Sequence, residues 1–328
     1  MPKTQPKPDR TQQELSAIHV LRENPRTPEA LAQLRQALAD KSSFVVAAAA
    51  EVVAAAELAE LLPLLREAFA RFMINPEKSD KGCKAKLAIA DALYRNESQD
   101  EALFRSGLHH RQMEPIWGGR QDTAAELRGL CALALAQIGM PGVIEDLAEL
   151  LADPEVTARA LCLRALGASG REEALPLLRY KLRIGDEAGE VMLECCAALL
   201  ALAPRRTLPV LAQVLEQSDE ARSEAAALAL GQSRHEDALP LLQAFAQRRP
   251  VPERRVALVA IAMLRSPAAT SHLLDLVATA PLSLATQAVR ALAVHRYDAA
   301  LHARVRAAAQ ARDEAALVRE CEEAFAGR

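Results

Sequence analysis

The segment SGLHHRQMEPIWGGRQDT, from Ser106 to Thr123, contains side chains suited to binding another molecule. It holds the only tryptophan of the chain, two of its 7 histidines and three of its 13 glycines. Trp117 offers a large rigid contact, and Arg111 and Arg120 can each grip a carboxylate or a phosphate with two hydrogen bonds. The predicted binding residues are His109, His110, Arg111, Met113, Glu114, Trp117 and Arg120, together with Lys81 and Lys84 from a neighbouring segment.

A purely structural role is the alternative for the same segment. Trp117, Ile116 and Met113 could pack onto the edge of the protein and fill a gap beside a short helix. Long loops in compact domains are usually functional or disordered, which keeps the binding interpretation open beside the packing one. The sequence leaves both open.

Metal binding is a further possibility, because His109, His110 and Glu114 are close together in the chain. Adjacent histidines in an extended segment point to opposite sides, however, and neither an HExxH helix nor Cys/His pairs at zinc spacing occur. We therefore predict no metal and no cofactor.

Nucleophilic catalysis has one candidate residue. Cys83 follows Gly82 between Lys81 and Lys84 at a predicted helix start, a setting in which positive charge could lower the pKa of a thiol. A partly buried, unreactive thiol is the ordinary alternative. The chain has no G-x-S-x-G elbow, Walker loop or GxGxxG motif, so no catalytic residues are predicted.

The composition indicates an all-α protein. Hydrophobic residues make up 51% of the 328 positions but aromatic residues only 3%, so Ala, Leu and Val must build the core, as suits closely packed helices. The formal net charge of -3 gives no general attraction to phosphate, and no long Lys/Arg tract occurs. Nucleic acid is therefore an unlikely partner.

Cysteine placement and hydropathy indicate a cytoplasmic protein without a membrane span. The six cysteines lack CxxC pairing and mostly lie in apolar runs, which predicts buried reduced thiols. The polar, Pro-rich start MPKTQPKPDRTQQ resembles neither a signal peptide nor an anchor, and no run reaches the roughly 18 apolar residues of a membrane helix.

The chain repeats with a period close to 32 residues. Five similar passages begin at Val143, Leu175, Leu208, Leu239 and Ser271, at intervals of 31 to 33 residues. Each opens with apolar residues at helical spacing, breaks at a short polar turn and resumes as a second apolar helix. Such a helical hairpin cannot bury its apolar faces alone, so the period predicts stacked hairpins, an α-solenoid.

The repeats EVTARALCLRALG and EARSEAAALALG resemble the HEAT-repeat family, in particular the short bacterial units also found in phycobilin lyase subunits. The resemblance covers Val143 to about Tyr297. It implies a superhelix of stacked hairpins, and most members of the family are scaffolds and adaptors with a few enzymes. Over the whole chain we count about eight hairpins and a C-terminal cap. The single pair His235-Glu236 is superficially similar to the His-Glu pairs of deoxyhypusine hydroxylase, but that family needs several, so a turn is expected there.

The repeat pattern also predicts the boundaries of the other regions of the chain. Residues 1–13 are expected to be a disordered tail, and 14–328 a single solenoid. Within it we predict degenerate repeats over 14–142, regular repeats over 143–300 and a C-terminal cap over 301–328. The enlarged turns at 75–84 and 107–121 should lie side by side, since equivalent turns of a solenoid project from one edge. Lys78, Lys81, Lys84 and Lys86 would form a basic cluster beside them.

The predicted function is a non-enzymatic scaffold or adaptor. A protein or peptide partner would bind the concave face and the decorated N-terminal edge, because stacked hairpins present a rigid, extended surface. The alternatives are an enzyme or enzyme subunit of the HEAT-like lyase type and, with less support, a HEAT-like DNA glycosylase. The identity of the partner and the oligomeric state stay open.

Overall fold

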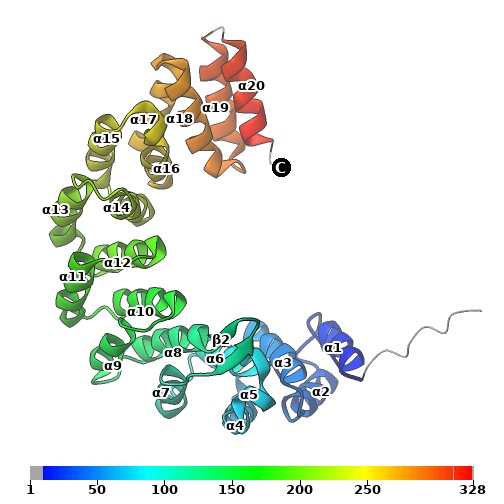
Figure 1. Ribbon diagram of the computed structural model, residues 1–328. Coiled ribbons are helices and arrows are strands. Elements are labelled where there is room, and N and C mark those ends of the chain that lie inside the picture. Colours follow the sequence, from blue (N-terminus) through cyan, green and yellow to red (C-terminus); the bar gives the residue numbers. More distant parts are fainter. Residues whose placement is uncertain (1–9, 313, 327–328) are drawn as a thin grey trace, which may run out of the picture. The chain divides into compact units, whose positions relative to one another are not determined.

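The computed structural model describes residues 10–312 and 314–326. The chain divides into two units, Met1–Ser169 and Gly170–Arg328. Both are α-solenoids of antiparallel helical hairpins, four in each unit, and Figure 1 shows their helices in chain order. Residues 1–9, which make up most of the predicted tail, lie outside the described residues.

Unit 1 contains four helical hairpins, α2/α3, α4/α6, α7/α8 and α9/α10, preceded by α1. Its elements are α1 (Arg10–Leu21), α2 (Pro28–Leu38), α3 (Ser43–Ala56), η1 (Ala59–Leu61), α4 (Leu62–Phe72), α5 (Pro76–Ser79), η2 (Lys81–Cys83), α6 (Lys84–Arg95), α7 (Glu101–Leu108), β1 (Met113–Ile116), β2 (Gly119–Asp122), α8 (Ala125–Ile138), α9 (Val143–Leu150) and α10 (Val156–Ala168).

Unit 2 contains the hairpins α11/α12, α13/α14, α15/α16 and α17/α18, followed by the pair α19/α20. Its elements are η3 (Glu172–Ala174), α11 (Leu175–Ile184), α12 (Gly189–Leu202), α13 (Pro204–Leu215), α14 (Glu220–Ser233), α15 (Ala238–Arg248), η4 (Val251–Arg254), α16 (Arg255–Met263), α17 (Pro267–Thr279), α18 (Leu282–Leu292), η5 (Ala293–His295), α19 (Ala299–Gln310) and α20 (Ala315–Phe325).

The second helices of successive hairpins pack against each other and form the densest layer of each unit. In unit 1 this layer is α3, α6, α8 and α10, and in unit 2 it is α12, α14, α16 and α18 (Figure 1). Small residues bring these helices close, and Ala49, Ala50 and Ala90 are completely buried. Gly107 has the same effect between α7 and α8, because a Cβ there would overlap the Sγ of Cys131.

An aspartate marks the turn between the two helices in each of the first six hairpins. Its carboxylate accepts a hydrogen bond from a backbone N–H at the start of the second helix, which caps an otherwise unpaired donor. These residues are Asp40, Asp80, Asp122, Asp153, Asp186 and Asp219. The separations are 40 and 42 residues up to Asp122 and 31 to 33 residues after it, so the enlarged turns are insertions into a preserved frame.

Three local features differ from the sequence prediction. Helix α1 begins at Arg10, inside the predicted tail, where Arg10 Nε and Glu14 Oε1 form an i,i+4 ion pair of 2.8 Å. The C-terminal cap, predicted over 301–328, begins earlier, at Ala299, and consists of the two helices α19 and α20. The turn predicted over 107–121 begins only after α7 ends at Leu108, and it folds into the antiparallel hairpin β1–β2.

Candidate interaction site

The two enlarged turns of unit 1 lie side by side and are hydrogen-bonded to each other. Gly82 donates its backbone N–H to Oε1 of Glu114 at 2.6 Å, and Nε2 of Gln112 donates to the carbonyl of Asp80 at 2.7 Å. Near the tip, Arg120 Nη2 lies 3.1 Å from Glu77 Oε1. The α4–α6 turn and the α7–α8 turn therefore form one continuous edge, which we call the hairpin edge (residues 75–84 and 109–124).

Glu114 fastens the β1 strand to this edge. Its Oε1 accepts hydrogen bonds from the Gly82 N–H, the Gln112 side-chain amide and the Thr123 hydroxyl. Burial raises the pKa of the Glu114 carboxyl, but these hydrogen bonds outweigh burial, so its pKa is lowered overall. The sequence placed Glu114 among the binding residues; the structure gives its carboxylate an internal, structural role.

Arg128 and two turn aspartates fix the base of the hairpin. The guanidinium is 1% exposed and forms a bidentate pair with Asp153, with Nε–Oδ2 and Nη2–Oδ1 distances of 2.9 and 3.0 Å. Its Nη1 donates to Asp122 Oδ2 at 2.8 Å and to the His110 carbonyl at 2.9 Å. Burial raises the pKa of Asp122, but the N–H groups of Ala124 and Gln112 and the Arg128 charge lower it overall.

A second buried ion pair underlies the α4–α6 turn. Lys86 Nζ lies 2.9 Å from Asp80 Oδ2, and both side chains are completely buried. Lys86 therefore does not belong to the exposed basic cluster that the sequence suggested. Buried charges of this kind persist only when they are paired, so removing either partner would leave an uncompensated charge under the turn.

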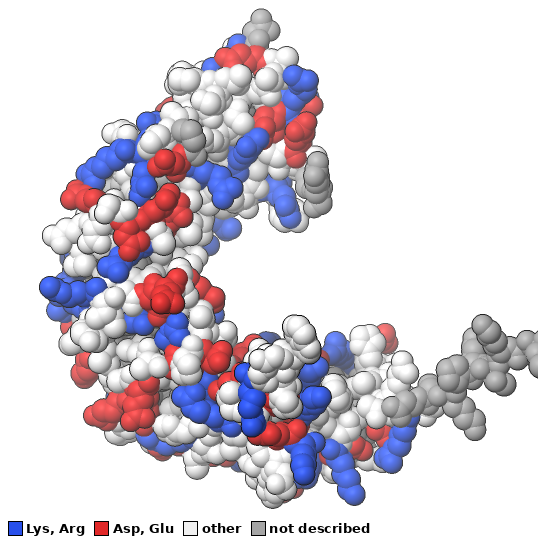
Figure 2. Space-filling model, in the orientation of Figure 1, with Lys and Arg blue, Asp and Glu red and all other residues white. Residues whose placement is uncertain are grey.

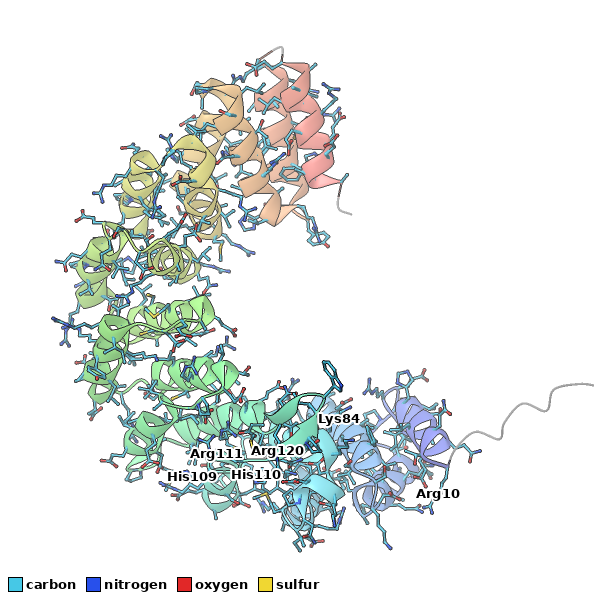
Figure 3. The ribbon with its side chains drawn as sticks, viewed as in Figure 1. Arg10, Lys84, His109, His110, Arg111 and Arg120 are labelled. Carbon is cyan, nitrogen blue, oxygen red and sulfur yellow. The ribbon has the colours of Figure 1, made fainter. Side chains whose placement is uncertain are left out.

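The two arginines of the segment are already engaged within the protein. Arg111 Nη2 lies 3.2 Å from Asp153 Oδ2, and Arg120 pairs with Glu77 while also donating to the Met113 carbonyl. The sequence expected both guanidiniums to be available for a ligand's carboxylate or phosphate. Both guanidiniums form ion pairs within the protein and are still more than half exposed, at 52% and 56% (Figure 3 labels both residues).

The two histidines also divide between surface and interior. His109 is exposed at the end of α7, whereas His110 is half-buried, with Nε2 3.2 Å from Gln112 Oε1. Burial lowers the pKa of His110, so its ring is neutral at neutral pH. Within the described residues, no group of three or more His, Cys, Asp or Glu side chains is placed to hold a metal ion.

The tip of the hairpin exposes apolar side chains. Trp117 is fully exposed, at 102% of its reference surface, and Ile116 and Met113 are 51% and 39% exposed. The alternative that Trp117 packs onto the edge is therefore wrong for this side chain. Gly118 has a φ of 88°, in the left-handed region that favours glycine, and so allows the two-residue turn between the strands.

Cys83 is not an activated nucleophile. Its side chain is 1% exposed, and burial raises the pKa of its thiol to about 12, outweighing the nearby charge of Lys86. The predicted electropositive setting is thus overridden by desolvation. All six cysteines are buried and none of them forms a disulfide, as the sequence predicted.

An apolar groove of about 680 Å³ runs across the second-helix layer of unit 1. It begins at the first turns of α3, α6 and α8, where the hairpin edge also lies. Phe44, Leu87, Leu130 and Leu133 provide large apolar walls, and the groove is lined further by Leu15, Ala47, Ala48, Glu51, Lys84, Ala88, Asp91, Arg95, Glu126 and Leu161. Of these residues, only Lys84 is among the binding residues that the sequence predicts.

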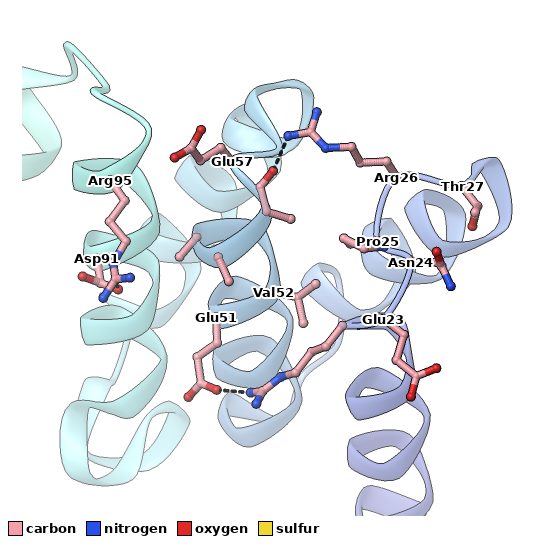
Figure 4. Close-up of a pocket in the computed structure, with 14 residues that line it drawn as sticks. Glu23, Asn24, Pro25, Arg26, Thr27, Glu51, Val52, Glu57, Asp91 and Arg95 are labelled. Atoms are coloured by element: carbon pink, nitrogen blue, oxygen red, sulfur yellow. Dashed lines mark hydrogen bonds and ion pairs between the residues drawn. The ribbon is translucent and has the colours of Figure 1, made fainter. Parts of the chain in front are cut away.

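A second hollow, of about 990 Å³, lies around the α1–α2 loop and the last turns of α3 and α6 (Figure 4). Its arginines are paired within the protein. Arg22 Nη2 pairs with Glu51 Oε2 at 2.6 Å, Arg26 donates to the Ala56 carbonyl, and Arg95 pairs with Asp91. These contacts tie α1 and α2 to α3, and we assign them a structural role.

Comparison with known families identifies the type of repeat. Residues 117–188 and 180–262 match HEAT repeats. Residues 117–262 of the chain therefore contain HEAT repeats, as the sequence pattern predicted. The search of curated proteins gave no match.

Among solved structures, one similar chain is human deoxyhypusine hydroxylase in complex with glycerol. The match covers 88% of this chain and 98% of that one, with 19% sequence identity and a TM-score of 0.30. These values are too low to transfer that enzyme's activity to this chain. No helix in the described part of the chain has the length and apolar character needed to span a membrane.

Proposed function

We propose that this protein is a non-enzymatic scaffold or adaptor, which binds a protein or peptide through the hairpin edge and the adjoining groove of unit 1. The observation that carries the proposal is the fully exposed Trp117 at the tip of a hairpin whose base is fixed by buried ion pairs. Tryptophan is the residue type most enriched at the energetic centres of protein interfaces.

Preorganisation supports the same proposal. The Arg128 pairs and the Glu114 hydrogen bonds hold the hairpin before any partner arrives, so little conformational entropy remains to be lost on binding. Several buried charges are expensive to maintain in a turn that only connects two helices. A role in presenting a rigid apolar tip to a partner would explain why this turn contains them.

No feature of the described residues favours the lyase or the glycosylase alternative specifically. A glycosylase of this fold would need a cationic face for the DNA backbone. Figure 2 instead shows Lys and Arg side chains interspersed with Asp and Glu on the visible face of each unit. A lyase would need a tetrapyrrole pocket, and a coloured adduct on mixing with a bilin would reveal that activity.

The direct test compares two exposed aromatic side chains. Wild-type protein, Trp117→Ala and Tyr297→Ala are used to recover partners from lysate by affinity, after equal thermal stability has been checked. Tyr297 is 90% exposed in unit 2 and serves as the matched control. We expect one partner to be lost with Trp117→Ala and kept with Tyr297→Ala. Recovery of the same partners by all three proteins would contradict the proposal.

A further inference from the structure

Resting on the proposed interaction role, we infer the chemistry of the partner: an acidic peptide segment that also carries large aliphatic side chains. Its carboxylates would pair with Lys78 and Lys81, and with Lys84 at the groove entrance. Its apolar side chains would cover the tip of the hairpin and enter the groove of unit 1.

The first argument is the charge left over along the hairpin edge. Three of the four carboxylates of this edge are paired with cations: Asp80 with Lys86, Asp122 with Arg128, and Glu77 with Arg120. Glu114 is held by three uncharged donors and keeps its negative charge, on which Lys81 acts. Lys78, Lys81 and Lys84, in contrast, are exposed and have no ion pair among the described residues. The edge is therefore locally positive in a chain whose formal net charge is -3.

The surface view agrees with this count. In Figure 2 the surface over the β1–β2 hairpin is white, with Lys and Arg side chains on both sides of it and acidic side chains below. An apolar contact flanked by positive charge complements an apolar segment flanked by negative charge. Such complementarity mainly sets which partner is accepted and how fast it associates.

The second argument is that the β1 edge of the hairpin presents side chains to a partner but few free backbone hydrogen-bonding groups. Along β1, Pro115 has no N–H, and the Met113 carbonyl already accepts a hydrogen bond from Arg120. An incoming strand would find few free groups on this strand edge. Recognition through Trp117, Ile116 and Met113 remains, and these side chains suit aliphatic or aromatic residues of a partner.

The third argument is the continuity between edge and groove. Lys84 lines the groove, and its Nζ lies 5.0 Å from the centre of the Phe44 ring. Beyond this point the groove is floored by small alanines and walled by leucines, which suits a helix or an extended peptide with aliphatic side chains. The lysines are thus at the entrance and the apolar surface lies within.

The same groove disfavours nucleic acid. Glu51, Asp91 and Glu126 line it; the first two are paired with Arg22 and Arg95, and Glu126 has no partner among the described residues. A phosphate backbone would bring negative charge along its whole length past these carboxylates. A peptide can confine its acidic residues to the segment that contacts Lys78 and Lys81, which do not line the groove and lie apart from these carboxylates.

The experiment uses Trp117 as its own reporter, because it is the only tryptophan of the chain. The probe is a Trp-free synthetic peptide of about 15 residues with Leu along one helical face and Glu grouped at one end. Matched peptides replace the Glu residues by Lys or the Leu residues by Ser, and a single-stranded oligothymidylate is tested as the nucleic-acid alternative. We measure the emission maximum of Trp117 during titration.

We expect the Glu/Leu peptide to shift the emission saturably to shorter wavelength, and the other three probes to leave it unchanged. The variant Lys78→Glu/Lys81→Glu should weaken the Glu/Leu peptide at least about tenfold and gain binding of the Lys/Leu peptide. The control Arg179→Glu/Arg183→Glu reverses two exposed charges on α11 in unit 2 and should change nothing.

Three results would overturn the inference: no shift with the Glu/Leu peptide up to about 1 mM, the weak end of specific affinity; equal binding of the Lys/Leu peptide; or a salt-sensitive shift with the oligothymidylate. These failures are distinct from failure of the scaffold role. A partner captured in a Trp117-dependent manner, without binding of the acidic peptide, would keep the role and refute only the partner chemistry.

Discussion

The enlarged turns of unit 1 and the short turns of unit 2 solve the same structural problem in different ways. In unit 2, residues 185–188 and 216–219 connect the helices of two hairpins, and Asp186 or Asp219 caps the second helix. In unit 1, residues 73–83 and 109–124 make the equivalent connections, and Asp80 or Asp122 has the same capping role.

The difference lies in what surrounds the aspartate. Asp219 is half exposed and pairs with Arg222 of its own helix, whereas Asp122 is 2% exposed and shares Arg128 with Asp153 of the next hairpin. Long insertions are tolerated because the capping aspartate is retained. They become rigid because they bring additional buried polar groups that satisfy one another.

The largest effect is expected from removing the guanidinium at the base of the hairpin. Arg128→Met leaves the Asp122 and Asp153 carboxylates buried without their cation, which should cost about 3–5 kcal/mol of unfolding free energy. The matched change Arg222→Met affects a more exposed pair and should cost less than about 1 kcal/mol. Chemical denaturation of both variants tests this; equal losses would remove the distinction between the two kinds of turn.

Breaking the lysine–aspartate pairs should show what the turns have in common. Lys86→Met and Lys181→Met each remove the cation beside a buried turn aspartate, Asp80 or Asp186, and both should lose about 2–4 kcal/mol. The exposed Lys81→Met is the control and should be neutral. If Lys181→Met were also neutral, stabilisation by a buried lysine–aspartate pair would be confined to the enlarged turns.

Glu114→Ala should loosen the hairpin edge more than it destabilises the whole protein. The substitution leaves the Gly82, Gln112 and Thr123 donors without their shared acceptor, at a cost of about 1–3 kcal/mol. Hydrogen exchange should accelerate in residues 80–84 and 112–123 and stay unchanged in unit 2. Glu114→Gln retains an acceptor oxygen and should recover part of the protection; acceleration spread over the whole chain would argue against a local role.

Lowering the pH should weaken the same edge, because its stabilising carboxylates become protonated. The pKa values of Glu114 and Asp122 are lowered on folding, so their stabilisation is complete above the ordinary carboxyl pKa of about 4 and is lost as the pH falls through the lowered values. Urea denaturation between pH 7 and pH 3, values that bracket the carboxyl range, measures this. The Glu114→Ala/Asp122→Ala variant should lose less stability over that interval; an equal loss would assign the acid response to other groups.

The smallest effect concerns the turn of the hairpin. An added Cβ meets nothing within 4 Å at either Gly118 or Gly119, but only Gly118 has a positive φ. Gly118→Ala should therefore cost about 1 kcal/mol through backbone strain, while Gly119→Ala should be nearly neutral. Hydrogen exchange of β1 and β2 measures both changes. Equal effects would show that the turn does not depend on the left-handed residue.

The sequence located the elaborated edge but not its strands. The alternation of apolar and polar residues around 113–122 is short, and the Gly-Gly pair after Trp117 was the only turn signal available. Two short segments flanking a Trp-Gly turn are compatible with a β-hairpin. The helix-rich surroundings favoured an irregular turn instead.

The roles of individual charged residues were the least predictable part of the site. Lys81, Lys84 and Lys86 look alike in the sequence, yet the first two are exposed and the third is fully buried against Asp80. Helix periodicity distinguishes the two faces of α6, but the burial of Lys86 depends on a turn that comes earlier in the chain. The partners of Arg111 and Arg120, which are Asp153 and Glu77, likewise come from turns distant in the sequence and cannot be read from the residues around each arginine.

By itself, the sequence determined the repeating helical hairpin, the all-α class, the buried cysteines and the position of the unusual segment, because helix periodicity and turn chemistry are local properties. Only the tertiary structure decided which charged side chains form ion pairs within the protein and which are exposed on its surface. Arg128 and Asp153 are 25 residues apart, and Gly82 and Glu114 are 32 apart, so their pairing depends on how neighbouring hairpins stack. That stacking satisfies the polar groups at the base of the hairpin and leaves Trp117 exposed at its tip.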